Sequence, residues 1–125
     1  MTTLYAVHVS SVKEFELRKE GAKRVKVKYL LHAGIGAKRI QLRLFTIDVG
    51  GYTPLETHKH EHEVFILKGK AKIYGENKVL LAEAGTAIHI SSFEKHKVEN
   101  AGEEPLQFLC TKETSEIPKE LKSQI

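Results

Sequence analysis

The sequence is poor in cysteine, tryptophan and proline: its 125 residues include one cysteine, no tryptophan and three prolines. A single thiol, Cys110, excludes an internal disulfide. Its neighbours in LQFLC are apolar, so we interpret it as a small buried side chain rather than a reactive one. No stretch approaches the ~20 apolar residues that span a bilayer, and the first residues do not show the pattern of a signal peptide. We therefore expect a cytoplasmic protein without a membrane partner.

Net charge is also small, at +4 from 20 basic and 16 acidic residues. The densest basic stretch, KRVKVKYLL at 23–31, alternates Lys26 and Lys28 with Val25 and Val27. This period of two predicts a strand with one apolar and one solvated face. No aromatic platform or recognition helix accompanies the charge, so nucleic acid is not an expected partner. Frequent Lys and Glu, with few Asn and Gln, are typical of thermophile proteins.

Short apolar runs rich in β-branched and aromatic residues alternate with glycine-containing turns. Strands are predicted near residues 4–9, 24–31, 39–48, 62–68, 70–74, 78–82, 86–91, 95–99 and 105–111. Many short strands of even spacing indicate an all-β sandwich or barrel in a single domain. Segment 14–21 is interpreted as a helical turn or a loop, and Pro118 is placed to open a short helix over 119–125 unless that tail is frayed.

The stretch GGYTPLETHKHEHEVFILKG, residues 50–69, carries three histidines at alternate positions. Imidazole and carboxylate groups are ligands that Fe, Mn, Ni, Cu and Zn accept. In an extended strand, residues of one parity share a face. Four chelating residues have that parity: Glu56, His58, His60 and His62. From the residues alone, two to four of them face one metal, or the cluster is an exposed loop without function.

The spacing in this stretch resembles the first motif of the cupin family. There, a glycine is followed by five residues, His-x-His, three or four residues, Glu, six residues and a glycine. In this chain, Gly50 and five residues precede Glu56-Thr57-His58. Three residues then precede His62, and six more precede Gly69. Every spacing fits, but Glu stands at the first ligand position and His at the third.

The second cupin motif has a counterpart further along the chain. Its pattern is Gly, five residues, Pro-x-Gly, two residues, His, three residues and Asn. Gly85, His96 and Asn100 fit this pattern, whereas Ser91 and Phe93 replace the proline and the second glycine. Only 15 residues separate Gly69 from Gly85, as in compact microbial cupins. The chain thus resembles small single-domain cupins over about residues 38–111.

The resemblance implies a fold and a ligand set. The fold is an antiparallel jelly-roll β-barrel, with one divalent transition metal (Fe, Mn, Ni, Cu or Zn) inside one end. Carried over position by position, the motifs predict four ligands: Glu56, His58, His62 and His96. A rival register uses the literal His-x-His of His58 and His60, but its third ligand falls on Val64 or Phe65, which cannot ligate. In the preferred register, Glu56 and His60 are also candidate proton carriers. A cupin that holds no metal is the remaining alternative, because Glu56, Ser91 and Phe93 depart from the pattern.

Cupins serve several chemistries, so the resemblance leaves three functional classes open. The preferred hypothesis is a metal-dependent enzyme of dioxygenase type that acts on a small organic molecule. The others are a metal-dependent sugar or keto-acid isomerase and a non-catalytic binder of a small ligand. Arg43 is a candidate for holding a substrate carboxylate if it points into the barrel.

Three regions are predicted along the chain. Residues 1–37 form N-terminal strands and a connector, 38–112 form the barrel core with both motifs, and 113–125 form a polar tail. Small cupins often pair through an N-terminal strand and a sheet face. The resemblance therefore implies a homodimer with contacts from the N-terminal region.

Overall fold

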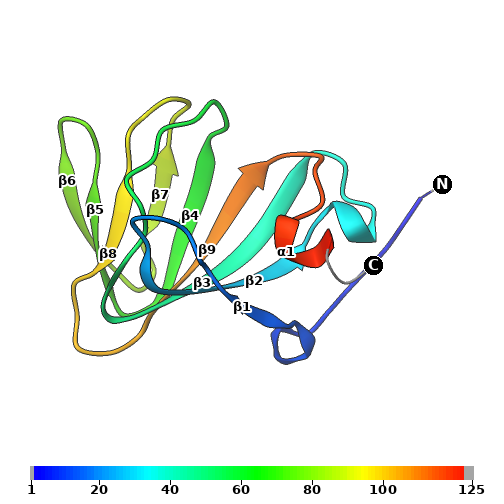
Figure 1. Cartoon of the computed structure of the whole chain (residues 1–125), viewed down its shortest axis with the longest axis horizontal. Helices are drawn as coiled ribbons and strands as arrows, with labels where there is room; N and C mark the ends of the chain where they lie inside the picture. Colours follow the sequence, from blue (N-terminus) through cyan, green and yellow to red (C-terminus); the bar gives the residue numbers. More distant parts are fainter. Residues whose placement is uncertain (1, 123–125) are drawn as a thin grey trace.

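The structure is a computed structural model that describes residues 2–122, and its main feature is one curled antiparallel sheet (Figure 1). The strands are β1 (Glu14–Glu16), β2 (Lys23–Leu31), β3 (Ile40–Tyr52), β4 (His62–Lys68), β5 (Lys70–Tyr74), β6 (Val79–Glu83), β7 (Ala87–Ile90), β8 (Lys97–Asn100) and β9 (Leu106–Glu113). Short helical turns are η1 (Val9–Ser11), η2 (Ala33–Ile35) and α1 (Lys119–Lys122). The all-β barrel fold predicted from the sequence is confirmed.

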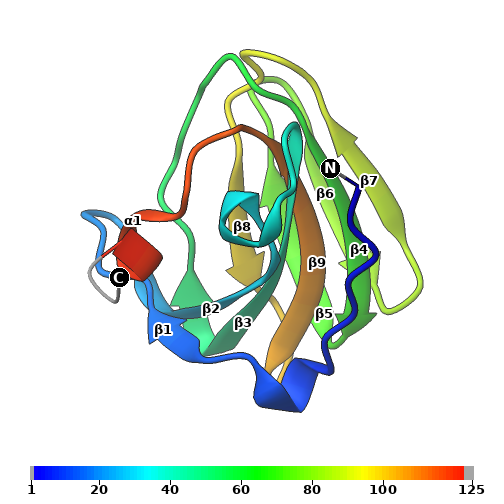
Figure 2. The ribbon, with the colours of Figure 1, turned by 90° about the vertical axis from the view of Figure 1, so that its right-hand side faces the viewer.

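Strand β3 connects the two halves of the barrel. The sheet order is β6-β5-β8-β3-β9-β4-β7, with β2 paired to β3 and β1 paired to β2. Most of β3 lies between β2 and β9, and its last residue, Tyr52, pairs with Glu99 of β8. Figure 2 shows how β9, β3 and β2 curve around an interior that β4 and β8 close from the other side.

The interior is filled by alternate residues of the strands. Burial alternates along β4, where Val64 and Ile66 point inward while Glu63 and Phe65 point outward. The side chains of Ile47, Ile66 and Leu106 are completely buried. Phe45 and Phe108 stack across the β3–β9 pair with ring centroids 5.2 Å apart. This apolar floor is continuous with the pocket described below.

Gly69 makes the tight connection between β4 and β5. Its φ of +85° lies in the left-handed region, and an added Cβ would lie 2.9 Å from the carbonyl oxygen of Pro105. Both constraints exclude a side chain, which explains the glycine at this position of the first motif.

Three predictions about local structure need correction, and a fourth is confirmed for the residues that the structure describes. Residues 2–8 contain no strand where one was predicted at 4–9, because the chain enters η1, which the His8 side chain caps. Segment 14–21 is neither a helical turn nor only a loop: its first part forms β1, paired through Glu14 to Lys28. Phe15 supplies the reason, since it packs beside Tyr29 with ring centroids 6.2 Å apart.

The other two concern the histidine stretch and the tail. Residues 57–61 form no strand, so alternation of a strand does not explain where His58 and His60 point. The helix after Pro118 is present as α1, and residues 123–125 of the predicted helix lie outside the described residues.

Candidate metal centre

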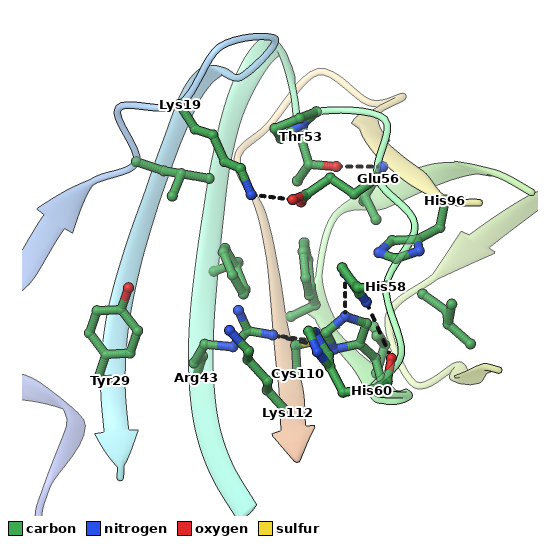
Figure 3. Close-up of a pocket in the computed structure, with 18 residues that line it drawn as sticks. Lys19, Tyr29, Arg43, Thr53, Glu56, His58, His60, His96, Cys110 and Lys112 are labelled. Carbon is green, nitrogen blue, oxygen red and sulfur yellow. Dashed lines mark hydrogen bonds and ion pairs between the residues drawn. The ribbon is translucent and has the colours of Figure 1, made fainter. Parts of the chain in front are cut away.

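One end of the barrel encloses a cavity of about 210 Å³. Its apolar wall comes from β3, β4, β7 and β9 and includes Phe45, Val64, Ile90 and Phe108. Four histidines line it as well: His58, His60, His62 and His96. Figure 3 shows His58, His60 and His96 gathered on one side of the cavity. The cavity therefore combines an apolar wall with a cluster of imidazoles.

Three of these histidines converge although they come from different segments. His62 is the first residue of β4, His96 immediately precedes β8, and His58 lies in the loop before β4. One ring nitrogen from each lies within 4.8 Å of those of the other two. The Nε2 atoms of His58 and His62 are 3.3 Å apart. His62 and His96 are buried, and His58 is half-buried.

Backbone carbonyls orient all three rings. The Nδ1 atom of His62 lies 2.8 Å from the oxygen of Thr111, that of His96 2.9 Å from Glu94, and that of His58 3.2 Å from His60. A carbonyl only accepts hydrogen bonds, so each Nδ1 is assigned the proton. Each Nε2 is then unprotonated and free to ligate. The same pattern is usual for histidines that bind metals.

Burial keeps the rings of His58 and His62 neutral. It lowers the pKa of His62 to about 3 and also lowers the pKa of His58. Neutral imidazole is the form that binds a metal ion. Two unprotonated nitrogens 3.3 Å apart repel each other unless a cation lies between them. Nitrogens about 2.0–2.1 Å from a tetrahedral zinc ion lie about 3.3–3.4 Å apart, so the spacing of His58 and His62 matches that of two ligands of a divalent transition metal.

Glu56, the predicted fourth ligand, lies on the same wall but is turned elsewhere. Its backbone forms an isolated antiparallel bridge with His96, which places the two side chains side by side. Its carboxylate forms an ion pair with Lys19 (Figure 3) and is outside the group of converging ring nitrogens. Glu56 as a ligand stays a prediction that requires its carboxylate to leave Lys19.

His60 is packed against the cluster without belonging to it. Its ring stacks on that of His58 with centroids 3.7 Å apart, and burial lowers its pKa to about 4. The proximity is compatible with both the proton-carrier role and the rival ligand register predicted for it. The convergent group among the described residues, however, is His58, His62 and His96.

Phe93 shows how this chain accommodates one departure from the second motif. It stands where the motif has its second glycine, and its φ is +63°. Its N–H donates to the carbonyl of His58 at 2.8 Å, and its own carbonyl accepts from the Thr57 hydroxyl at 2.8 Å. These bonds fasten the loop that carries His58. The left-handed conformation is thus retained without glycine.

Sequence reasoning missed two charged residues of the pocket, Lys19 and Lys112. Lys112 could have been predicted from the sequence, because it has the same parity in β9 as the buried residues Phe108 and Cys110. Lys19 lies in a loop, and no pattern in the sequence marks it. Arg43 does point into the barrel, as its hypothesis required.

The fold and this centre define a β-barrel protein with a three-histidine cluster inside. Residues 43–112, more than half of the chain, match the Cupin domain family. This protein is a member of the cupin family. No helix in the described part of the chain has the length and hydropathy to cross a membrane.

Similar proteins agree with this assignment. The chain is 33% identical over 87 residues to protein MJ1618 of Methanocaldococcus jannaschii, covering 67% of this chain and 69% of that protein. It is 33% identical over 70 residues to 1-methylthio-D-xylulose 5-phosphate methylsulfurylase of Rhodospirillum rubrum. That match covers 56% of this chain and only 45% of the relative. The polyketide cyclase RemF from Streptomyces resistomycificus has the same fold, with a TM-score of 0.83, 24% identity and coverage of 98% and 94%.

Proposed function

We propose that this protein is a metal-dependent enzyme of dioxygenase type that acts on a small organic molecule inside the barrel. Its metal ligands are His58, His62 and His96, with Glu56 as the fourth. The observation that supports this most is the convergence of one ring nitrogen from each of three histidines at a partly apolar cavity. A divalent redox metal bound there would supply Lewis acidity and electron transfer to substrate and O₂.

The number of ligands favours an oxygenase. Three imidazoles, with or without Glu56, leave two or three positions of a six-coordinate ion open, enough for a substrate and O₂ together. The wall of Phe45, Val64, Ile90 and Phe108 limits water near the histidines. Such a dry wall protects reactive species from side reactions.

Two residues of the chain are suited to proton transfer. Glu56 Oε2 accepts from the Lys19 ammonium, and moving away from Lys19 would let it take a proton from substrate. His60 is neutral because burial lowers its pKa, so it also has a free ring nitrogen. These groups also support the second candidate, isomerisation of a sugar or keto acid. The relative whose name includes 1-methylthio-D-xylulose 5-phosphate is consistent with small-molecule chemistry of this kind.

The test is elemental analysis of untagged protein followed by paired assays. Near-stoichiometric Fe, Mn, Cu or Ni, with O₂ uptake on enolic or phenolic substrates, supports the oxygenase. Turnover that persists without O₂, or with zinc alone, supports the isomerase. Ligand binding without chemical change of the ligand would leave the non-catalytic binder. We also propose a cytoplasmic location, in which the lone Cys110 stays reduced.

A further inference from the structure

The charged residues of the pocket do not balance. Its lining contains three cations, Lys19, Arg43 and Lys112, and one carboxylate, Glu56. Glu56 is already paired with Lys19. Within residues 2–122, neither Arg43 nor Lys112 forms an ion pair. The pocket thus has two positive charges without a directly paired carboxylate in the described chain, and Glu116 and Glu56 act on Lys112 only from a longer range.

Arg43 is held in the interior by weak partners. Its guanidinium lies over the ring of Phe45, 4.8 Å from the centroid. One terminal nitrogen, Nη2, lies 3.2 Å from Cys110 Sγ; it also lies 3.4 Å from His62 Nδ1, which carries the proton and therefore accepts no hydrogen bond from it. The Nε atom is buried and lacks a hydrogen-bond partner among the described residues. A guanidinium in this position is costly unless an acceptor complements it.

Lys112 lies next to Arg43 on the same inner face. Residue 112 pairs with Gln41, and Arg43 pairs with Cys110, so Arg43 and Lys112 are diagonal neighbours across β3 and β9. Figure 3 shows the Arg43 and Lys112 side chains close to each other in the pocket. Burial and the nearby Arg43 both lower the pKa of Lys112. Two adjacent cations of this kind favour an anion between them.

We propose that the pocket takes a small organic acid whose carboxylate is held by Arg43 and Lys112, with the rest of the molecule facing the three histidines. This proposal rests on the proposed function in one respect: both take this cavity to be the substrate site. A cavity of about 210 Å³ admits only a small acid. Arginine binds the two oxygens of a carboxylate in a planar pair of hydrogen bonds.

A phosphate ester fits the surroundings less well. Phosphate sites commonly use backbone N–H groups at a helix N-terminus or in a concave turn. The strands β2, β3, β4 and β9 that form the pocket wall instead use their backbone groups in the sheet. The positive groups that these strands offer to the ligand are therefore the side chains of Arg43 and Lys112.

The test is a titration of the full chain with malonate, malonamide and inorganic phosphate. Metal is first removed from the protein with a chelator, and the chelator is then removed. Binding is followed through ¹⁵N-correlated NMR spectra, including the Arg43 Nε–H signal. We expect saturable shifts at Arg43 with malonate and none with malonamide. Arg43→Gln and Lys112→Gln should each weaken malonate binding by about tenfold or more, and Arg43→Lys should recover part of the loss.

The matched control is Lys78→Gln, which removes one positive charge from an exposed turn distant from the pocket lining. Equal malonate affinity in Lys78→Gln, Lys112→Gln and Arg43→Gln would overturn the proposal, as would binding of phosphate without binding of malonate. If Arg43→Gln does not fold, the malonate affinity of Lys112→Gln decides the test. The titration contains no metal, so it tests the organic-acid proposal independently of the proposed function. If the protein binds malonate in a charge-dependent way but never takes up metal, the proposed function is refuted and the organic-acid proposal stands. Metal-dependent O₂ uptake with unchanged malonate affinity would refute the organic-acid proposal alone.

Discussion

Glu56 and His96 join the two motifs directly, through two backbone hydrogen bonds of 3.0 and 2.9 Å. This bridge stands outside the named strands and fixes the irregular loop before β4 against the segment before β8. His58 is two residues beyond one partner, and His96 is the other partner itself. The bridge therefore holds two of the three converging histidines at a set separation before any metal binds.

The first prediction concerns metal and thermal stability. A metal that binds only the folded chain should stabilise it by about 2.7 kcal/mol when its free concentration is a hundred times Kd. For a chain of 125 residues, this corresponds to a Tm increase of roughly 10 °C. Differential scanning calorimetry of metal-free and metal-loaded protein measures this shift.

Single replacements identify the ligands. His58→Ala, His62→Ala and His96→Ala should each abolish most of the increase in Tm. His89→Ala is the matched control, because His89 is exposed and pairs with Glu63 at 2.7 Å. An undiminished shift in any of the first three variants would remove that residue from the ligand set.

The second prediction separates Glu56 from His60. Glu56→Gln should weaken metal binding by at least about tenfold, since it removes a predicted charged ligand, whereas His60→Gln should leave the affinity unchanged. Competition with a chromophoric chelator gives both affinities. Lys19→Gln serves as a further control, because it frees the Glu56 carboxylate from its ion pair and should not lower the affinity for the metal. The opposite order, with His60 essential and Glu56 dispensable, would support the rival register.

Strand positions were predictable because burial on one face repeats every two residues. The predicted ranges 62–68 and 70–74 coincide with β4 and β5. Segments whose conformation depends on distant partners were not predictable in this way. β1 exists because Phe15 packs beside Tyr29 of β2, and nothing within residues 14–21 specifies that contact.

The candidate site was predictable in part for a different reason, the spacing of residues in two motifs. The spacing of His58, His62 and His96 follows family motifs, and the structure brings these three together. The strand geometry used to orient residues 56–62 was wrong, because carbonyls and the Glu56–His96 bridge orient this loop instead. The place of Lys19 beside Glu56 depends on how a remote loop folds over the barrel, which no local pattern encodes.

The third prediction concerns Asn100, the last residue of the second motif, which has a structural role. Its buried amide donates to the carbonyls of Ile47 and Glu104, both at 2.9 Å, and accepts from Gly102 N–H at 2.9 Å. Asn100→Ala leaves these groups unpaired and should lower the free energy of unfolding by about 1–3 kcal/mol. Urea unfolding of the metal-free protein measures the loss. Asn77→Ala, in an exposed turn, should cost far less. A large loss of metal affinity in folded Asn100→Ala would contradict a purely structural role.

The fourth prediction concerns the thiol of Cys110. Its side chain is 5% exposed, and burial raises its pKa, so little thiolate is present at neutral pH. A thiol-specific disulfide reagent should react at least about a hundredfold more slowly with native than with guanidinium-unfolded protein. This ratio is expected if the free energy of the local opening that exposes Cys110 is ~3 kcal/mol. Lys78→Cys in a Cys110→Ser background gives the rate of an exposed thiol. Equal rates in both native proteins would show that the cavity wall opens freely.

The fifth prediction is that two copies of this chain form a homodimer. Phe65 and Leu67 of β4 point away from the interior and are 43% and 44% exposed. Phe65 borders a hollow on the outer face of the sheet together with Leu42, Ala87 and Leu109. A second copy packed on this face would bury these side chains, so sedimentation equilibrium should give twice the 14.1 kDa chain mass. Phe65→Glu should shift the protein to monomer, whereas Leu81→Glu, at a 78% exposed position of β6, should not. A wild-type chain that sediments at its own mass up to high protein concentration would refute the dimer.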